Sequence, residues 1–286
     1  MTRLLDGRTI VVTGGSMGIG LACAEECARE GAHVVICARG AGELAKAVEG
    51  LNGKVGRVVR GVTADVTQPA DVARLFAEAG TVGPPDGVVH CAGVYGPIGP
   101  VVRVDPEEWL GAVETNLFGT FLVAREACRA MIASGTKGSI VLMSGGGAAT
   151  PFPNYTAYAC GKIGVVRLAE TLALEVAPHG IRVNTIAPGF VVTRLHQQTL
   201  AAGRDLAGDF VETTRQQLQK GGVPPSVAAR CAAFLLSARA EGITGRFVAA
   251  PYDGYAEWTG KLDTIEGSDL FTLRRIVPRD RGMDWQ

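Results

Sequence analysis

The sequence alternates short, continuous apolar runs with longer amphipathic segments, and this alternation limits the fold more than any other feature. Continuous apolar runs are typical of strands that are covered on both faces of a sheet. The segments between them are long enough to return the chain for a parallel strand. The expected strands are residues 9–13, 34–38, 55–64, 87–91, 138–144, 182–187 and 246–250, and the expected helices are 18–30, 42–51, 71–79, 106–132, 157–177 and 225–237. This order predicts an α/β fold with a parallel sheet.

Right-handed crossovers in such a chain build a doubly wound, Rossmann-like parallel sheet with helices on both faces. The 286 residues are 47% hydrophobic, which is enough for one large core. No repeat or low-complexity linker divides them, so we expect a single domain over residues 1–286. Two segments depart from the strand–helix pattern: the polar, helical residues 195–223 and the charged, aromatic C-terminal extension at 258–286.

Composition excludes several classes of function. The 28 basic residues balance 28 acidic ones, so there is no charge excess to attract a nucleic acid. No apolar stretch reaches the roughly 18 residues that cross a membrane, and the N-terminus lacks the apolar core of a signal peptide. Seven scattered cysteines without a Cys-x-x-Cys pair indicate a reducing compartment and no metal site. We expect a cytoplasmic protein with no nucleic acid, membrane or metal as partner.

A glycine-rich turn at residues 13–20 joins the first expected strand to the first helix. Backbone N–H groups at such a turn approach a pyrophosphate, and side chains would block that approach. Gly14 permits the tight turn, Gly18 the close approach of the phosphates, and Gly20 the packing of helix on strand. The alternative is an ordinary strand-to-helix turn. The residues predicted to bind a dinucleotide here are Gly14, Ser16, Met17, Gly18, Ile19 and Gly20.

The end of the second expected strand bears on which dinucleotide is bound. A cofactor with a free 2′-hydroxyl usually meets a carboxylate at this point. Here the strand ends in Cys37-Ala38-Arg39, and Arg39 can hold a 2′-phosphate through charge-assisted hydrogen bonds. An exposed loop arginine without this role is the alternative. The sequence therefore favours NADP(H), with NAD(H) as the other candidate.

Tyr158 and Lys162 are four residues apart at the start of an expected helix, which places them on one face, one turn apart. A phenol has an ordinary pKa of about 10, too high for a general base at neutral pH. A neighbouring ammonium lowers that pKa because it favours the phenolate. Such a tyrosine can give a proton to a carbonyl oxygen or take one from an alcohol.

These motifs, in this order, resemble those of the classical short-chain dehydrogenase/reductase family. Residues 13–20 match its Thr-Gly-x-x-x-Gly-x-Gly, and residues 158–162 match its Tyr-x-x-x-Lys. The resemblance extends to about Gly254. It implies that Tyr158 and Lys162 also bind the cofactor, and that the chain forms a homotetramer or homodimer through residues 109–132 and 157–177. Further cofactor-binding residues implied by the family's motifs are Asp65, Val66, Ala92, Gly93, Pro188, Gly189 and Thr193.

The resemblance also implies catalytic roles. Tyr158 is the acid/base, Lys162 lowers its pKa, and Asn116 orders a water that links Lys162 to solvent. Ser144 is expected to hydrogen-bond the substrate oxygen and stabilise its developing charge. Residues 195–223 occupy the place of the family's substrate-covering lid, which can exclude water.

Three features differ from the family pattern. The family's Asn-Asn-Ala-Gly is His90-Cys91-Ala92-Gly93 here, and a packing role for His90 is favoured over a catalytic one. Ser144 precedes Tyr158 by fourteen residues rather than the family's thirteen, so its role requires the following glycines to absorb one residue. The third is the C-terminal extension. Its arginines, open to an anionic substrate or to a neighbouring subunit, are Arg274, Arg275, Arg279 and Arg281; a solvated tail held by Trp258 and Trp285 is the alternative.

The expected function is an NAD(P)(H)-dependent oxidoreductase that interconverts a small-molecule ketone or aldehyde and an alcohol. A polar or anionic substrate, such as a sugar or cyclitol ketone, is favoured by the arginines of the extension. Tyr155 is expected either in the substrate pocket or in the core. The alternatives are an NAD-dependent sugar-nucleotide epimerase or dehydratase, against which the glycine spacing argues, and a non-catalytic dinucleotide-binding regulator. A pure binder would have no use for the catalytic set.

Overall fold

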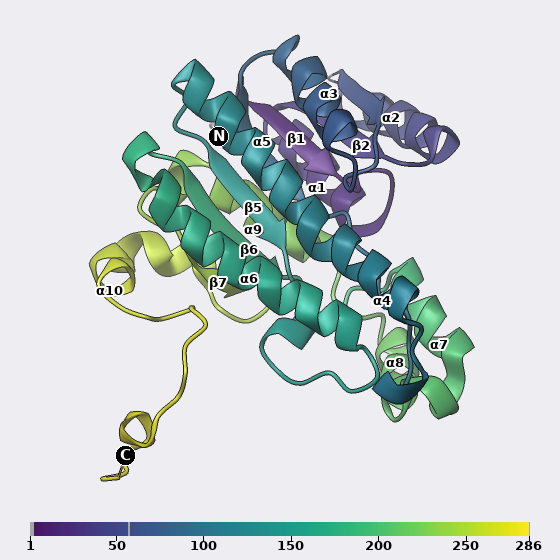
Figure 1. Ribbon diagram of the computed structural model, residues 1–286. Coiled ribbons are helices and arrows are strands. Elements are labelled where there is room, and N and C mark those ends of the chain that lie inside the picture. The colour runs from purple at the N-terminus through teal and green to yellow at the C-terminus, as the bar shows by residue number, and fades with distance from the viewer. Residues whose placement is uncertain (1–2, 57, 286) are drawn as a thin grey trace.

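The computed structural model describes residues 3–56 and 58–285. Seven parallel strands form one sheet in the order β3-β2-β1-β4-β5-β6-β7 (Figure 1). The sheet builds outward in both directions from β1 and β4, and a crevice at the carboxyl ends of the strands is expected where the order reverses. The strands are β1 (Thr9–Thr13), β2 (His33–Ala38), β3 (Val59–Thr63), β4 (Pro85–His90), β5 (Ser139–Met143), β6 (Arg182–Ala187) and β7 (Phe247–Ala249).

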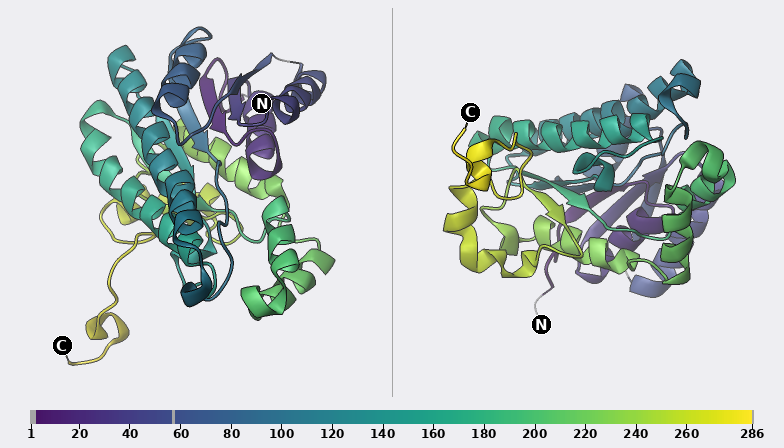
Figure 2. Two further views of the ribbon diagram at one scale, coloured as in Figure 1. Left: turned by 45° about the vertical axis from the view of Figure 1, so that its right-hand side comes forward. Right: turned by 90° about the horizontal axis from the view of Figure 1, so that it is seen from below.

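Helices cover both faces of the sheet, as the view from below shows (Figure 2). One face carries α1 (Gly18–Arg29), α2 (Ala41–Val55) and α9 (Pro225–Leu236). The other carries α3 (Pro69–Gly80), α5 (Gly119–Ser134) and α6 (Thr156–Val176). Successive residues of β1 alternate between the two cores: Ile10 and Val12 pack on the first face and Val11 on the second. The predicted doubly wound α/β fold is confirmed.

Three elements differ from their predicted bounds. The strand expected at 55–64 is only β3, because α2 continues to Val55 and ends at Gly56 in the left-handed conformation, with φ of 62°. The helix expected at 106–132 is divided into α4 (Pro106–Val113), a π-helical turn (Glu114–Phe118) and α5. The polar segment at 195–223 holds two helices, α7 (Arg194–Ala207) and α8 (Phe210–Gln219).

The C-terminal extension is folded against the body of the molecule through residue 273. It contains a 3-10 turn (Tyr255–Lys261) and α10 (Leu262–Glu266). Trp258 is buried and packs on Phe271 with ring centroids 4.3 Å apart. The backbone N–H of Phe247 in β7 donates to the carbonyl of Phe271 at 2.7 Å, so the extension covers part of the edge of the sheet.

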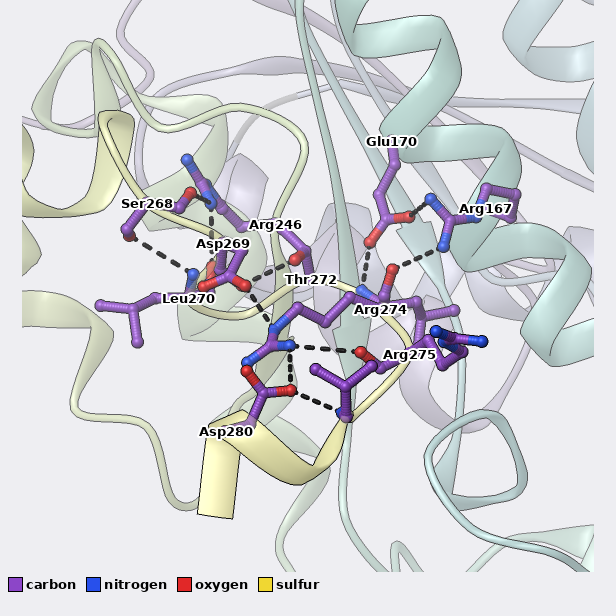
Figure 3. Close-up of polar contacts among 12 residues, drawn as sticks. Arg167, Glu170, Arg246, Ser268, Asp269, Leu270, Thr272, Arg274, Arg275 and Asp280 are labelled. Carbon is purple, nitrogen blue, oxygen red and sulfur yellow. Dashed lines mark hydrogen bonds and ion pairs between the residues drawn. The ribbon is translucent and has the colours of Figure 1, made fainter. Parts of the chain in front are cut away.

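Polar contacts hold the extension in place (Figure 3). The Arg246 guanidinium donates to the backbone carbonyls of Ile265, Ser268 and Leu270 at 2.5–2.9 Å. On α6, Glu170 accepts from the backbone N–H of Leu273 at 2.6 Å, and Arg167 donates to the Leu273 carbonyl. After these contacts the chain projects away from the body (Figures 1 and 2). Trp258 therefore anchors the extension, whereas Trp285 is 64% exposed.

Candidate active site

A cavity of about 610 Å³ lies where the strand order reverses, a size typical of small-molecule and cofactor sites. The predicted cofactor residues that line it are Gly14, Ser16, Met17, Gly18, Ile19, Gly20, Arg39, Asp65, Val66, Ala92, Gly93 and Thr193. Pro188, Gly189, Tyr158 and Lys162 do not belong to this lining, and neither do the described residues of the C-terminal extension. The structure thus brings most of the predicted cofactor residues together and leaves the arginines of the extension elsewhere.

The glycine turn has the shape that a pyrophosphate cradle needs. Gly14 has φ of 63°, and a Cβ there would lie 2.9 Å from the backbone nitrogen of Ala92. A Cβ on Gly20 would lie 2.2 Å from the Gly14 carbonyl oxygen, so only glycine lets α1 pack this close. The cap residue Met17 places no side-chain hydrogen bond on the helix start. The N-terminal N–H groups of α1, beside the cavity, therefore fit an anionic diphosphate.

The adenosine end of the cavity carries charges of both signs. Arg39 is exposed at the end of β2. Glu43, in the first turn of α2, also lines the cavity, and its carboxylate is 3.8 Å from the guanidinium of Arg194 on α7. Sequence reasoning missed Glu43, because this residue lies beyond the strand end where a ribose-binding carboxylate is expected. Its ion pair with Arg194 joins α2 to the lid across the cavity.

The Asp65 carboxylate is oriented by its own loop. It accepts from the backbone N–H of Thr67 at 2.9 Å and from the Thr67 hydroxyl at 2.8 Å. The backbone N–H of Asp65 in turn donates to Asp71 at 2.8 Å. These bonds hold Asp65 in its loop, and both Asp65 and Val66 line the cavity.

Tyr158 and Lys162 lie one turn apart on α6, with the Lys162 ammonium nitrogen 5.7 Å from the centre of the Tyr158 ring. Lys162 donates to the carbonyl of Met143 at the end of β5, at 2.9 Å. Burial raises the pKa of Tyr158 to about 12 and lowers the pKa of Lys162 to about 8, because each charged form loses its hydration. A Cβ on Gly93 would lie 3.2 Å from the Lys162 nitrogen, so this pair is adjacent to the cavity wall.

Asn116 is fully buried in the π-helical turn, a kind of local distortion that is frequent at functional sites. Its side-chain amide donates to the carbonyl of Val94 at 2.8 Å and accepts from the Val94 N–H at 3.1 Å. Its backbone carbonyl accepts from the Thr120 hydroxyl at 2.6 Å. Because Asn116 and Lys162 both approach Gly93, the structure brings these two predicted catalytic residues together.

The structure does not bring the Ser144 hydroxyl to Tyr158. This hydroxyl is buried and donates to the backbone carbonyl of Lys162 at 3.0 Å. The residue that faces Tyr158 is Gly145, where a Cβ would lie 2.5 Å from the Tyr158 oxygen. The residue thirteen positions before Tyr158 is Gly145, and the backbone of the glycine loop does not bring Ser144 into its place. This placement contradicts the prediction that the Ser144 hydroxyl contacts the substrate oxygen.

His90 is buried at the end of β4, with its Nδ1 2.8 Å from the hydroxyl of Thr13 in the neighbouring strand. Its Nε2 has no hydrogen-bond partner among the described residues. The pKa of His90 is lowered to about 3, mainly because the ring is buried and to a lesser extent because the Lys162 charge is near. A neutral, buried ring that bonds one strand to the next fits the favoured packing role.

Helices α7 and α8, which form the segment expected to be a lid, pack on an aromatic cluster next to Tyr158. Tyr155 is fully buried, and its hydroxyl donates to the Thr199 hydroxyl on α7 at 2.9 Å. Of the two places considered for Tyr155, the structure shows the core. Tyr95 lies between Tyr155 and Tyr158, with ring centroids 5.2 Å and 5.0 Å away. Sequence reasoning missed Tyr95, since it matched no motif and follows Gly93 in a loop.

The comparisons with known proteins agree with this geometry. A family model described as enoyl-(acyl carrier protein) reductase matches residues 14–251. The chain belongs to the classical short-chain dehydrogenase/reductase family. A relative from Xanthobacter autotrophicus, 2-(S)-hydroxypropyl-CoM dehydrogenase 3, is 32% identical over 86% of this chain and 95% of its own length.

Two solved structures of this family show the same fold. Actinorhodin polyketide ketoreductase with NADPH has a TM-score of 0.77 and 31% identity, covering 85% of this chain and 95% of that one. NAD⁺-bound xylitol dehydrogenase has a TM-score of 0.78 and 26% identity, covering 86% and 97%. As a family member, the chain is an NAD(P)-dependent oxidoreductase that acts on CH–OH groups. Across residues 3–56 and 58–285, none of the helices combines the length and apolarity of a membrane span.

Proposed function

We propose that the chain interconverts a ketone or aldehyde and an alcohol, with Tyr158 as the acid/base and NADP(H) as the preferred cofactor. The observation that carries this proposal is the pairing of Tyr158 and Lys162 on α6, next to Gly93 at the wall of the cofactor cavity. A phenol and an ammonium held together beside a dinucleotide site supply proton transfer where hydride transfer would occur.

The bound nicotinamide supplies or accepts the hydride. In the reducing direction Tyr158 donates its proton to the carbonyl oxygen, and its raised pKa keeps it protonated at neutral pH. In the oxidising direction Tyr158 accepts the proton of the alcohol, which requires a lower pKa. The Lys162 ammonium favours the phenolate, and its link to the Met143 carbonyl holds it in place.

The preference for NADP(H) is supported by Arg39. It lines the adenosine end of the cavity, and β2 ends without a carboxylate. Glu43, the acidic residue in this part of the lining, is 3.8 Å from the Arg194 guanidinium, which offsets its repulsion of a 2′-phosphate. Replacement of Arg39 by Ala should raise KM for NADPH at least tenfold and leave KM for NADH within about threefold. Equal changes for the two cofactors would contradict this preference.

A small-molecule carbonyl or alcohol is the proposed substrate. The arginines that suggested an anionic substrate lie outside the described cavity lining, and Arg274 is paired with Asp269 and Asp280. The cluster in front of Tyr158 is instead aromatic, with only a few hydroxyls. Both polar and apolar carbonyls therefore belong in an assay panel.

The test is oxidation of NADPH and of NADH with hydroxyacetone, D-fructose and cyclohexanone, for the wild type and for Tyr158→Phe. The phenylalanine variant should lose at least a thousandfold in kcat while it still quenches or enhances NADPH fluorescence on binding. Tyr158→Phe with wild-type turnover would refute the proposed chemistry. Cofactor binding without turnover of these or other carbonyls would favour the non-catalytic regulator.

A further inference from the structure

The substrate oxygen needs a second hydrogen-bond donor besides Tyr158, because negative charge develops on it as hydride arrives. The segment that follows β5 supplies no such side chain. Gly145 faces the Tyr158 hydroxyl, and the neighbouring Ser144 hydroxyl already donates to the Lys162 backbone carbonyl. Gly146, Gly147 and Ala148 carry no donor side chain. Within residues 144–148, no side chain is therefore free to donate to a substrate oxygen.

Tyr95 is placed to provide it. Its side chain is 95% buried, with a relative exposure of 5%, and its ring meets the Tyr158 ring edge to face at 87° and 5.0 Å. It lies two residues after Gly93, at the loop that passes Lys162 and Asn116. Tyr95 therefore approaches Tyr158 from the loop after β4, whereas Gly145 approaches it from the loop after β5.

The Tyr95 hydroxyl has no hydrogen-bond partner within residues 3–56 and 58–285. The neighbouring Tyr155 offers a contrast in the same cluster, since its hydroxyl is bonded to Thr199. The Tyr95 oxygen is not among the fully enclosed side-chain atoms that lack a partner in these residues, so it is open to solvent while the rest of the side chain is buried. A substrate oxygen at Tyr158 can therefore reach this hydroxyl and become its hydrogen-bond partner.

The protonation state of Tyr95 suits a donor. Burial raises its pKa far above the ordinary value, and the nearby charge of Tyr158 raises it further. Tyr158 raises the pKa of Tyr95 more than Tyr155 does, although the centroids of their two rings are almost equally distant from that of Tyr95. Tyr95 thus stays a phenol when Tyr158 ionises, and it can donate a hydrogen bond throughout the reaction.

We propose that Tyr95 is a second catalytic residue, whose hydroxyl donates a hydrogen bond to the substrate oxygen and takes the part that a serine at position 145 would otherwise have. The proton transferred to the carbonyl oxygen comes from Tyr158, and Tyr95 keeps its own. This inference rests on the proposed function, since it places the substrate oxygen at Tyr158.

The experiment compares Tyr95→Phe with Tyr155→Phe, a matched loss of one hydroxyl in the same aromatic cluster. Both are assayed with NADPH and the fastest substrate among hydroxyacetone, D-fructose and cyclohexanone, beside Tyr158→Phe. Tyr95→Phe should lower kcat 100- to 1000-fold, the usual effect of one lost oxyanion donor. KM and the Kd for NADPH should change less than threefold, because the lost bond forms mainly in the transition state. Tyr155→Phe removes the hydrogen bond to Thr199 on α7, so it should raise KM but lower kcat less than tenfold.

A kcat of Tyr95→Phe within threefold of the wild type would overturn the inference. Equal losses for Tyr95→Phe and Tyr155→Phe, or a parallel loss of NADPH binding, would mark Tyr95 as a packing residue and would also overturn it. These outcomes leave the proposed function standing if Tyr158→Phe is inactive. An active Tyr158→Phe would instead remove the proposed function and, with it, this role for Tyr95.

Discussion

His90, Tyr158 and Lys162 lie in the interior, and burial moves the pKa of each toward the value that keeps it neutral. For Tyr158 and Lys162 this opposes the charged forms that the proposed reaction uses in one direction, so a bound cofactor and the attraction between the two side chains would have to offset the loss of hydration. For His90 nothing in the reaction requires a charge. Its low pKa therefore concerns stability rather than turnover.

His90 should make the protein less stable in mild acid. Its pKa is about 3 in the folded chain and ordinarily 6.5, so below pH 6.5 the unfolded chain binds a proton that the folded chain does not. The free energy of unfolding contributed by His90 therefore falls as pH falls from 6.5 toward 3, by about 2 kcal/mol at pH 5. Urea unfolding at pH 7 and pH 5 should show that His90→Asn loses about 2 kcal/mol less than the wild type.

His179→Asn is the matched control for this measurement, because His179 is exposed after α6. Its loss of stability between pH 7 and pH 5 should equal that of the wild type. A His90→Asn protein with the wild-type pH dependence would show that His90 is protonated in the folded chain.

Ser144→Ala should have a modest effect on catalysis. The change removes the hydrogen bond to the Lys162 carbonyl, which we expect to cost about 1 kcal/mol of stability and less than tenfold in kcat. Thermal unfolding and NADPH oxidation measure the two effects. A hundredfold loss of kcat at unchanged stability would return Ser144 to the set of residues that contact the substrate.

The residues that sequence reasoning located best are those whose chemistry depends on neighbours in the chain. Gly14 and Gly20 lie in the same strand-to-helix turn. Tyr158 and Lys162 lie one helical turn apart on α6. Ser144 was assigned to the wrong contact because a one-residue shift in a glycine loop is decided by backbone geometry. Tyr95 was missed because it follows β4, while its ring partners come from the start of α6 and from α7, which only the fold brings together.

At the scale of elements, the lid segment is held by a buried hydrogen bond, an aromatic cluster and the exposed ion pairs Glu43–Arg194 and Arg103–Asp205. Thr199→Val leaves the Tyr155 hydroxyl buried without a partner, which should cost about 1–3 kcal/mol. The cost should fall on α7 and α8, so their amides should exchange with deuterium faster while those of β1 and β4 keep their rates. The double variant Tyr155→Phe/Thr199→Val should exchange more slowly than Thr199→Val alone. Equal exchange in the two would mean that this bond does not hold the lid.

The interruptions within elements were harder to predict than the elements themselves. The amphipathic pattern of residues 106–132 runs through the π-helical turn, whose extra residue is fixed by contacts of Asn116 with Val94 and Thr120. Similarly, α7 contains a kink at Gly203, with φ of 66°, which a helical pattern does not reveal. Propensity and periodicity report which face is apolar, and neither reports a side chain that bonds the backbone of a distant loop.

At the scale of the whole molecule, we propose that the exposed apolar face of α5 and α6 joins copies of the chain, as the family resemblance implied. Phe118 and Phe121 are each 42% exposed and stack on each other, and Leu174 on α6 is 79% exposed. Scattered exposed apolar residues are common, but here they recur along both helices, since Ile132 on α5 is 42% and Ile163 on α6 is 46% exposed, as expected for an interface. Phe121→Glu should therefore lower the mass measured by light scattering. Val102→Glu, at an 89% exposed residue outside these helices, should leave it unchanged.

An unchanged mass for Phe121→Glu would exclude this face as the interface. The projecting residues 274–285 would then be the next candidate, since Ile276 and Trp285 are 61% and 64% exposed. The docking of the extension could not be derived from sequence, because Arg246, Arg167 and Glu170 contact backbone groups, which have no sequence signature.

The packing of α1 against α9 has a consequence for how the chain matures during synthesis. Residues 18–29 leave the ribosome early, but the helix that covers them spans residues 225–236. Until residues 225–236 have been synthesised, Cys23 and Cys27 on α1 lack the residues of α9 against which they are buried in the folded protein. When an apolar surface is synthesised long before the segment that packs on it, folding is slower and aggregation is favoured. The nascent chain should therefore depend on chaperones for most of its translation, however stable the finished protein is.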